Sequence, residues 1–250
     1  MGLTSERVMG EVVKALASAK PSRFFVVLRD CGALAVVLPE VSALVGVPQP
    51  AAHHPEGDAF THVMMALDVA AAAGFDLDVR FAVLCHDFGK ARTPADVLPS
   101  HVGHDVAGAP VALAFANRLN APAAFRDLAV LVAAQHTRVH RAADMGAGAF
   151  MDLFKAADAF RRPDRLNKLV QAVQADSQGR GGNAGSQPFP QAAVVAGAFA
   201  AAMSVDVPAV LAKAKARAVA AGKDFDPRVT VVNARTMAVA AFVKARKQAA

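Results

Sequence analysis

The histidines are the side chains in this sequence whose clustering could support chemistry. All eight lie between His53 and His140, and the rest of the 250-residue chain contains none. Histidine and carboxylate side chains are preferred ligands of divalent transition metals. The cluster therefore predicts a metal site, although about half of the eight are expected to be structurally neutral, as isolated histidines usually are.

The pair His86-Asp87 is the most informative part of this cluster. It follows the apolar run FAVLC and precedes Gly89, so we expect it in the last turn of a buried helix. Successive helical residues point about 100° apart, which lets an imidazole and a carboxylate converge on one cation. The dipeptide alone is weak evidence, because a second one occurs at His104-Asp105.

The elements that must position these groups are helices. The chain is rich in alanine, which favours helix, and cap residues, glycines and prolines divide it into helical segments without a convincing alternating strand. We expect a first helix after Thr4 and further helices near 22–31, 59–73, 78–88, 108–119, 122–138, 147–160, 164–177, 190–204, 207–221 and 228–248. The sequence therefore predicts an all-α fold.

Composition divides the chain into three parts. The stretch 179–190, GRGGNAGSQPFP, is typical of a linker. We expect a helical neck/body segment over 1–50, a histidine-bearing domain over 51–180 and a basic helical tail over 190–250. The net charge of +6 lies entirely in the tail, which carries nine Lys or Arg and three Asp from Asp206 onward.

The basic tail has two interpretations, a surface that binds phosphate polymers or a solvated helix face, and both stay open. If the tail binds RNA, the contacts are expected from Lys213, Lys215, Arg217, Lys244, Arg246 and Lys247. No apolar stretch reaches the roughly 18 residues of a spanning helix. Glu6 and Arg7 also stand where a secretory signal needs apolar residues, so we expect a cytoplasmic protein without a membrane partner.

Five motifs that carry histidine or aspartate follow one another along the chain. They are FTHVMMAL with His62, LCHDFGK with His86 and Asp87, GHDVAG with His104, AAQHTRVH with His136, and QADSQGR with Asp176. Their order resembles the HD phosphohydrolase superfamily. Within it, SERVMGEVVKAL, FFVVLRDCGALAVVLPEV, HPEGDAFTH and FRRPDRL make residues 2–185 similar to the C-terminal part of the bacterial multifunctional CCA-adding enzymes.

The resemblance implies an HD-domain helical bundle and a metal-dependent phosphohydrolase that acts on 2′,3′-cyclic phosphates, 2′-nucleotides and phosphomonoesters. It also implies tRNA as a partner and phosphate-ester nucleotides as substrates. We expect the family's nucleotidyltransferase head to be absent, because the Asp-x-Asp at residues 76–78 is expected to be a helix-capping turn. Two alternative functions stay open, a non-catalytic tRNA-binding arm with a vestigial site and a free-standing HD nucleotide phosphohydrolase. Assembly into a homo-oligomer also stays open.

The resemblance, together with helical geometry, assigns residues to the predicted site. The first metal is assigned to His62, His86, Asp87 and Asp176, and His104 and His136 are candidates for a second metal or for the substrate phosphate. His86, Asp87 and Lys90 are the predicted catalytic residues, and Lys90 is expected to contact the substrate phosphate. The alternative for Lys90 is a solvated lysine without a role at the site. A histidine-rich set suits Mn²⁺, Ni²⁺, Co²⁺ or Zn²⁺ better than Mg²⁺.

Two positions leave alternatives within this assignment. Asp158 is the rival of Asp176 as the distal carboxylate, and the motif ADSQGR favours Asp176. Some relatives have an aspartate where this chain has Thr137, directly after His136. His140, one helical turn beyond His136, is the candidate to substitute for it.

Overall fold

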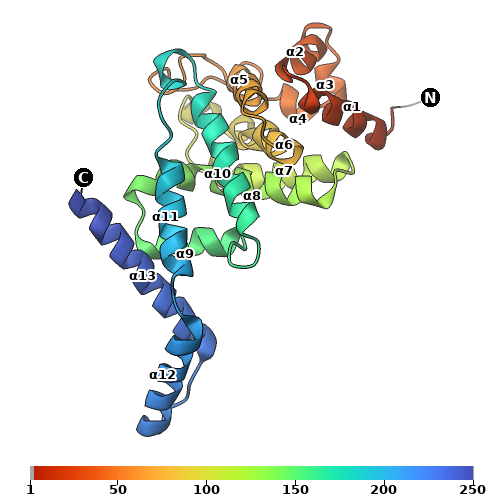
Figure 1. Cartoon of the computed structure of the whole chain (residues 1–250). Coiled ribbons are helices and arrows are strands. Elements are labelled where there is room, and N and C mark those ends of the chain that lie inside the picture. Colours follow the sequence, from red (N-terminus) through yellow and green to blue (C-terminus); the bar gives the residue numbers. More distant parts are fainter. Residues whose placement is uncertain (1–2, 250) are drawn as a thin grey trace. The chain divides into compact units, whose positions relative to one another are not determined.

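The computed structural model describes residues 3–249, so residues 1, 2 and 250 of the predicted neck and tail lie outside the described residues. Within 3–249 it contains thirteen α-helices, four short 3-10 helices and no β-strand beyond one isolated bridge between Pro48 and Asp58 (Figure 1). The predicted all-α fold is therefore confirmed.

The chain forms two compact units. The first contains the residues up to His140 together with Asp164–Phe189, and the second contains Arg141–Pro163 together with the residues from Pro190 onward. The segment 141–163, which we expected in the histidine-bearing domain, thus lies in the second unit. The division into three parts at residues 50 and 180 stays a prediction.

The first unit begins with four helices, α1 (Ser5–Ala17), α2 (Ser22–Asp30), α3 (Leu34–Val37) and α4 (Pro39–Ser42). The hydroxyl of Thr4 accepts a hydrogen bond from the backbone N–H of Arg7 and so caps α1, as its position before the first apolar residues predicts. Val12 and Leu16 are buried on one side of α1, which packs against helices of the same unit. These short helices therefore share the core of the first unit.

The remaining long helices of the first unit are α5 (Ala59–Ala72), α6 (Leu77–Cys85), α7 (His104–Arg118), α8 (Ala123–His140) and α10 (Pro163–Gln178). α7 and α8 lie side by side, and α6 packs against α8 (Figure 1). Phe81, Phe88 and Phe115 are buried between these elements, and the rings of Phe81 and Phe88 each contact the ring of Phe115. This aromatic core holds the ends of α6 and α7 close together.

Two helix boundaries differ from the prediction in ways that matter for the histidines. α6 ends at Cys85, so His86 and Asp87 follow the helix instead of forming its last turn. α7 begins at His104 rather than near residue 108, because Gly103 adopts a left-handed conformation (φ 81°) that starts the helix earlier. Consequently His104 stands at the first position of a helix.

The start of α6 is tied to α10 by charge. Asp76 is the N-cap residue of α6, but its side chain makes no capping hydrogen bond to the described helix, and Asp78 lies in the first turn. The Nζ atom of Lys168 lies 3.1 Å from Asp76 Oδ2 and 2.7 Å from Asp78 Oδ2. α10, which carries Asp176 near its C-terminal end, is thereby anchored to the N-terminal end of α6.

The second unit consists mainly of α9 (Ala147–Ala156), α11 (Gln191–Met203), α12 (Val207–Ala221) and α13 (Pro227–Ala249). Phe154, Phe160 and Phe199 form its aromatic cluster, with the guanidinium of Arg235 3.9 Å from the ring centroid of Phe160. α12 packs against α13, and within the described span of α12 no side chain is buried. Among the described helices, none is by itself both long and apolar enough to cross a membrane, and only α11 and α12 together, bent by 51°, reach that length.

Candidate metal centre

Four of the predicted ligands lie together in the first unit. His62 is on α5, His86 and Asp87 follow α6, and Asp176 is near the end of α10, and all four are buried. The Nε2 atom of His62 lies 3.0 Å from Asp176 Oδ1 and 3.8 Å from Asp87 Oδ2. The Nε2 atom of His86 lies 3.2 Å from Asp87 Oδ2 and 3.7 Å from Asp176 Oδ1. Two imidazoles and two carboxylates thus face one point.

A second group of ligands meets the other oxygen of Asp87. The Nε2 atoms of His104 on α7 and His136 on α8 lie 3.4 Å and 3.7 Å from Asp87 Oδ1. These two nitrogens are 2.9 Å from each other. Asp87 therefore stands between two neighbouring sets of donors, one at each of its oxygens.

All four histidines are held by the nitrogen that faces away from the centre. In each ring Nδ1 has an oxygen partner at hydrogen-bond distance, Glu56 Oε1 for His62 (2.8 Å), Val83 O for His86 (2.7 Å), His101 O for His104 (2.6 Å) and Ala133 O for His136 (3.0 Å). An Nδ1–H that donates to oxygen directs Nε2 at the centre, where its lone pair can bind a cation once Nε2 carries no proton, the arrangement common to metal-ligating histidines.

This arrangement fits a divalent cation. With Nδ1 donating in both rings, the Nε2 lone pairs of His104 and His136 oppose each other at 2.9 Å, which requires a proton or a cation between them. Two nitrogens bound at right angles to one ion through bonds of about 2.1 Å would be about 3.0 Å apart. In addition, His86 Nε2 and Asp87 Oδ1 are buried and have no hydrogen-bond partner among the described residues.

The electrostatics of the candidate site favour positive charge between its carboxylates. Burial opposes the ionisation of Asp87, yet the charges of His86 and Lys90 hold the pKa of its carboxyl well below the usual range. Burial likewise lowers the pKa of His86, but Asp87 and Asp176 outweigh it and raise this pKa to about 9. Burial and the charge of His86 lower the pKa of His136 to about 3, so its imidazole is neutral at pH 7. The carboxylates are thus ionised and stabilise a cation.

A close approach between two glycines brings His104 to Asp87. Gly89 lies in the 3-10 helix Phe88–Arg92, which packs against α7. A Cβ atom at Gly89 would overlap the carbonyl oxygen of His104 and lie 2.7 Å from the backbone nitrogen of Gly108. The glycine of LCHDFGK is therefore needed for backbone contact with α7. The prediction that His86-Asp87 and Gly89 mark the end of α6 is wrong, because α6 already ends at Cys85.

Lys90 is part of the centre and not a solvated lysine. Its side chain is buried, with Nζ 2.6 Å from Asp87 Oδ2 and 2.5 Å from Gln49 Oε1, to which it donates. The predicted phosphate contact of Lys90 stays a prediction. Gln49 was not identified from the sequence, because it lies in a proline-rich connection and belongs to none of the histidine motifs.

The positions for which alternatives were open have distinct surroundings. The hydroxyl of Thr137 donates to Asp105 Oδ2 at 2.6 Å. The neighbours of His104 and His136 in sequence are thus hydrogen-bonded to each other. His140 Nε2 lies 2.6 Å from Asp176 Oδ2. Asp158 belongs to the second unit, where its carboxylate lies 3.9 Å from both Arg161 and Arg162.

The predicted RNA-binding residues all lie in the second unit. Lys213, Lys215, Arg217, Lys244 and Lys247 are exposed, and Arg246 donates to the backbone carbonyl of Ala143. Lys213 and Arg217 are one turn apart and share a face of α12, whereas Lys215 points to the opposite side. The positive charge of these three residues therefore lies on two sides of α12 instead of forming one stripe.

Comparison with known proteins identifies the domain that holds the metal centre. Residues 59–176 match the model of the HD domain family, an interval that starts at α5 and ends at Asp176. This part of the chain is therefore similar to HD domains. Residues 2–44, ahead of the HD domain, match a model described as a probable RNA and SrmB-binding site of polymerase A.

The HD domain and its flanks are also similar to curated proteins named multifunctional CCA protein. The relative from Burkholderia cenocepacia (strain HI2424) is 52% identical over 208 residues, which cover 83% of this chain and 50% of the relative. Those from Burkholderia lata and Burkholderia vietnamiensis are 51% identical over the same length. The chain spans about half the length of these curated relatives, and the resemblance drawn from the motifs is confirmed.

Proposed function

We propose that this chain is a metal-dependent phosphohydrolase with a two-cation centre. The proposal is carried by one observation, that buried Asp87 meets the Nε2 atoms of two histidines at each of its oxygens. His62, His86, Asp87 and Asp176 would hold one cation, and Asp87, His104 and His136 the other. Bound divalent cations would lower the pKa of water and stabilise charge on phosphoryl oxygens.

The residues of the chain prepare the centre for this chemistry. The Nδ1 hydrogen bonds fix the imidazole rings before any ligand binds, so little reorganisation remains. Lys90, held by Gln49 and Asp87, carries a buried positive charge suited to a phosphate oxygen. Burial of the centre excludes bulk water and strengthens each electrostatic contact.

The proposed substrates are 2′,3′-cyclic phosphates, 2′-nucleotides and phosphomonoesters. The test is hydrolysis of 2′,3′-cyclic AMP, 2′-AMP and p-nitrophenyl phosphate with Mn²⁺, Ni²⁺, Co²⁺, Zn²⁺ or Mg²⁺ in turn. We expect activity that depends on the added metal, is lost in Asp87→Asn and is retained in Asp152→Asn, an exposed control on α9. Activity that survives both chelation and Asp87→Asn would contradict catalysis at this centre, and absence of activity with every metal would favour the alternative of a vestigial site on a non-catalytic arm.

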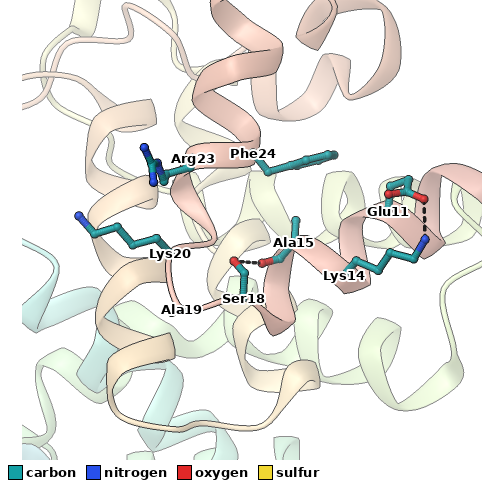
Figure 2. A pocket seen from close by; sticks show the side chains of 8 residues that line it. All are labelled: Glu11, Lys14, Ala15, Ser18, Ala19, Lys20, Arg23 and Phe24. Atoms are coloured by element: carbon teal, nitrogen blue, oxygen red, sulfur yellow. Dashed lines mark hydrogen bonds and ion pairs between the residues drawn. The ribbon is translucent and has the colours of Figure 1, made fainter.

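We also propose that the chain binds RNA, with tRNA as the partner, and that α1 and α2 contribute. The segment matched as a probable RNA-binding site spans these helices. Figure 2 shows a surface hollow between them from which Lys20 and Arg23 extend to the same side. Lys14, also at the hollow, is neutralised by Glu11 at 2.9 Å, so the excess positive charge comes from Lys20 and Arg23.

Two double variants distinguish this surface from the basic tail. Lys20→Ala with Arg23→Ala, and Lys213→Ala with Arg217→Ala, each remove two exposed charges. For the variant at the true contact, the slope of log affinity against log salt should shrink by about 0.7–0.9 per lost phosphate contact. Unchanged tRNA binding in both variants would contradict RNA contact at either surface, and absence of tRNA binding by the unmodified chain would favour a free-standing HD nucleotide phosphohydrolase.

The remaining features of the proposal follow from the same resemblance. We propose a cytoplasmic location, a neck/body segment over 1–50, an HD domain over 51–180 and a tail over 190–250. The oligomeric state is tested by sedimentation of the full chain, where a mass above that of one 25.8-kDa chain would support a homo-oligomer.

A further inference from the structure

The carboxylate of Glu56 makes contacts that neither the predicted ligand set nor the family match uses. Its side chain is 2% exposed although it lies in the loop before α5. Oε1 lies 2.8 Å from His62 Nδ1 and 2.9 Å from His54 Nδ1, and Oε2 accepts the backbone N–H of Gly181 at 2.8 Å. We propose that Glu56 is a positioning residue that orients His62 for cation binding, an inference that rests on the proposed metal centre.

His62 is anchored differently from the other three histidines. His86, His104 and His136 each place Nδ1 against a backbone carbonyl three residues earlier, at Val83, His101 and Ala133. His62 instead uses a side-chain carboxylate six residues earlier. Among these four rings, only the Nδ1 partner of His62 can be removed by a side-chain substitution, because the other three partners are backbone carbonyls.

A carboxylate in this position acts on the ligand through the ring. It fixes the proton on Nδ1, sets the ring orientation and makes Nε2 a better donor to a cation. His62 Nε2 is the atom that lies 3.0 Å from Asp176 Oδ1. Glu56 therefore controls the nitrogen that meets the distal carboxylate.

The second oxygen of Glu56 connects distant parts of the chain. Gly181 follows α10, the helix that carries Asp176, and is 125 residues from Glu56 in sequence. A Cβ atom at Gly181 would lie 3.2 Å from the backbone nitrogen of Glu56, so the two segments are in tight contact. One carboxylate thus ties the loop before His62 to the segment after Asp176 and sets the spacing of these two ligands.

The cluster of His54, Glu56 and His62 also has the composition of a metal site, since its donor atoms lie within 4.8 Å of one another. However, both histidines meet the same oxygen of Glu56 through Nδ1 at hydrogen-bond distance. Donation from both rings leaves no lone pair directed at a cation there. The geometry therefore favours positioning over a separate cation.

The test is Mn²⁺ binding to the chelator-treated full chain, followed by the electron paramagnetic resonance signal of free Mn²⁺. Glu56→Gln keeps the shape and removes the charge, and Glu40→Gln is the matched control because Glu40 pairs only with Arg118 on α7 among the described contacts. For Glu56→Gln we expect the same number of Mn²⁺ ions and a Kd about 10-fold or more above that of the unmodified chain. Glu40→Gln should bind as the unmodified chain does.

Three results would overturn the inference. An unchanged Kd in Glu56→Gln would show that the carboxylate does not act on His62. Loss of one whole Mn²⁺ equivalent, with the other sites at full affinity, would make His54, Glu56 and His62 a metal site in their own right. If the unmodified chain binds no Mn²⁺, the proposed metal centre falls as well, whereas the first two results leave it standing.

A measurement on the unmodified chain covers the case in which Glu56→Gln does not fold. In the Zn²⁺-loaded protein, ¹H–¹⁵N correlation spectra of the His62 ring should show the proton on Nδ1 and the metal shift on Nε2. Zinc ligation through Nδ1 of His62 would contradict the positioning role.

Discussion

The contact between Gly89 and the first turn of α7 leads to a sharp prediction for Gly89→Ala. The added Cβ would overlap the carbonyl oxygen of His104, and would lie 2.8 Å from its carbonyl carbon and 2.7 Å from the nitrogen of Gly108. Cβ atoms in real structures essentially never come within 3.0 Å of such atoms. Because these neighbours are backbone atoms, relief requires that the 3-10 helix or α7 moves.

The size of the effect follows from this displacement. Overpacking of a close contact costs about 1–3 kcal/mol of folding free energy. The movement also withdraws His104 from Asp87, from which its Nε2 is 3.4 Å away. A misplacement of about 1 Å in a catalytic site lowers the rate about 100-fold. We therefore expect Gly89→Ala to lose about 1–3 kcal/mol of stability and at least about 100-fold in kcat/KM.

The assays are urea unfolding of the metal-free chain and Mn²⁺-dependent hydrolysis of 2′,3′-cyclic AMP. Gly10→Ala in α1 is the control, because its Cβ would meet no described atom within 4 Å. This control should gain about 0.4–1 kcal/mol, as alanine restricts the unfolded chain. If Gly89→Ala unfolds at the urea midpoint of the unmodified chain and retains its activity, the account of this glycine is wrong.

Three further changes test other contacts. The pKa of His136 is lowered from 6.5 to about 3 on folding, so the metal-free chain loses free energy of unfolding as the pH falls below 6.5, where the unfolded chain takes up a proton. His136→Gln removes this loss, so between pH 7.5 and 5.5 its free energy of unfolding should rise by about 1 kcal/mol relative to that of the unmodified chain. Urea unfolding at the two pH values measures this difference, and no relative rise would refute the account. Mn²⁺ at about 100 times its Kd should stabilise the unmodified chain by about 2.7 kcal/mol in thermal unfolding, and an equal stabilisation of Asp87→Asn would contradict the shared carboxylate. Lys168→Ala should lose about 1 kcal/mol or less, and this loss should shrink in 1 M salt; a loss independent of salt would exclude the ion pairs with Asp76 and Asp78 as its cause.

The sequence by itself determined the helical class and the approximate place of each long helix. Alanine content, caps such as Thr4 and breaks such as Pro21 act on neighbouring residues, so their effect is legible along the chain. The start of α7 was missed because it depends on the left-handed conformation of Gly103, which a glycine permits but does not require. Local signals thus predict that helices exist better than they predict where helices begin.

The motifs also singled out the residues that line the centre. His62, His86, Asp87, Asp176, His104 and His136 were chosen from residue type, order and family resemblance, and the structure brings them together. Residue type limits the choice because few side chains can bind a cation and buried ones must find partners. The family motifs then select four of the eight histidines and favour Asp176 over Asp158.

Only the tertiary structure decided how these residues are held. Glu56 reaches Gly181 across 125 residues, and His62 reaches Asp176 across 114. Lys90 is buried against Asp87, although its sequence context equally allowed a solvated side chain. Such contacts depend on which helix faces pack and how closely backbones approach, and these are properties of the whole core that no local pattern records.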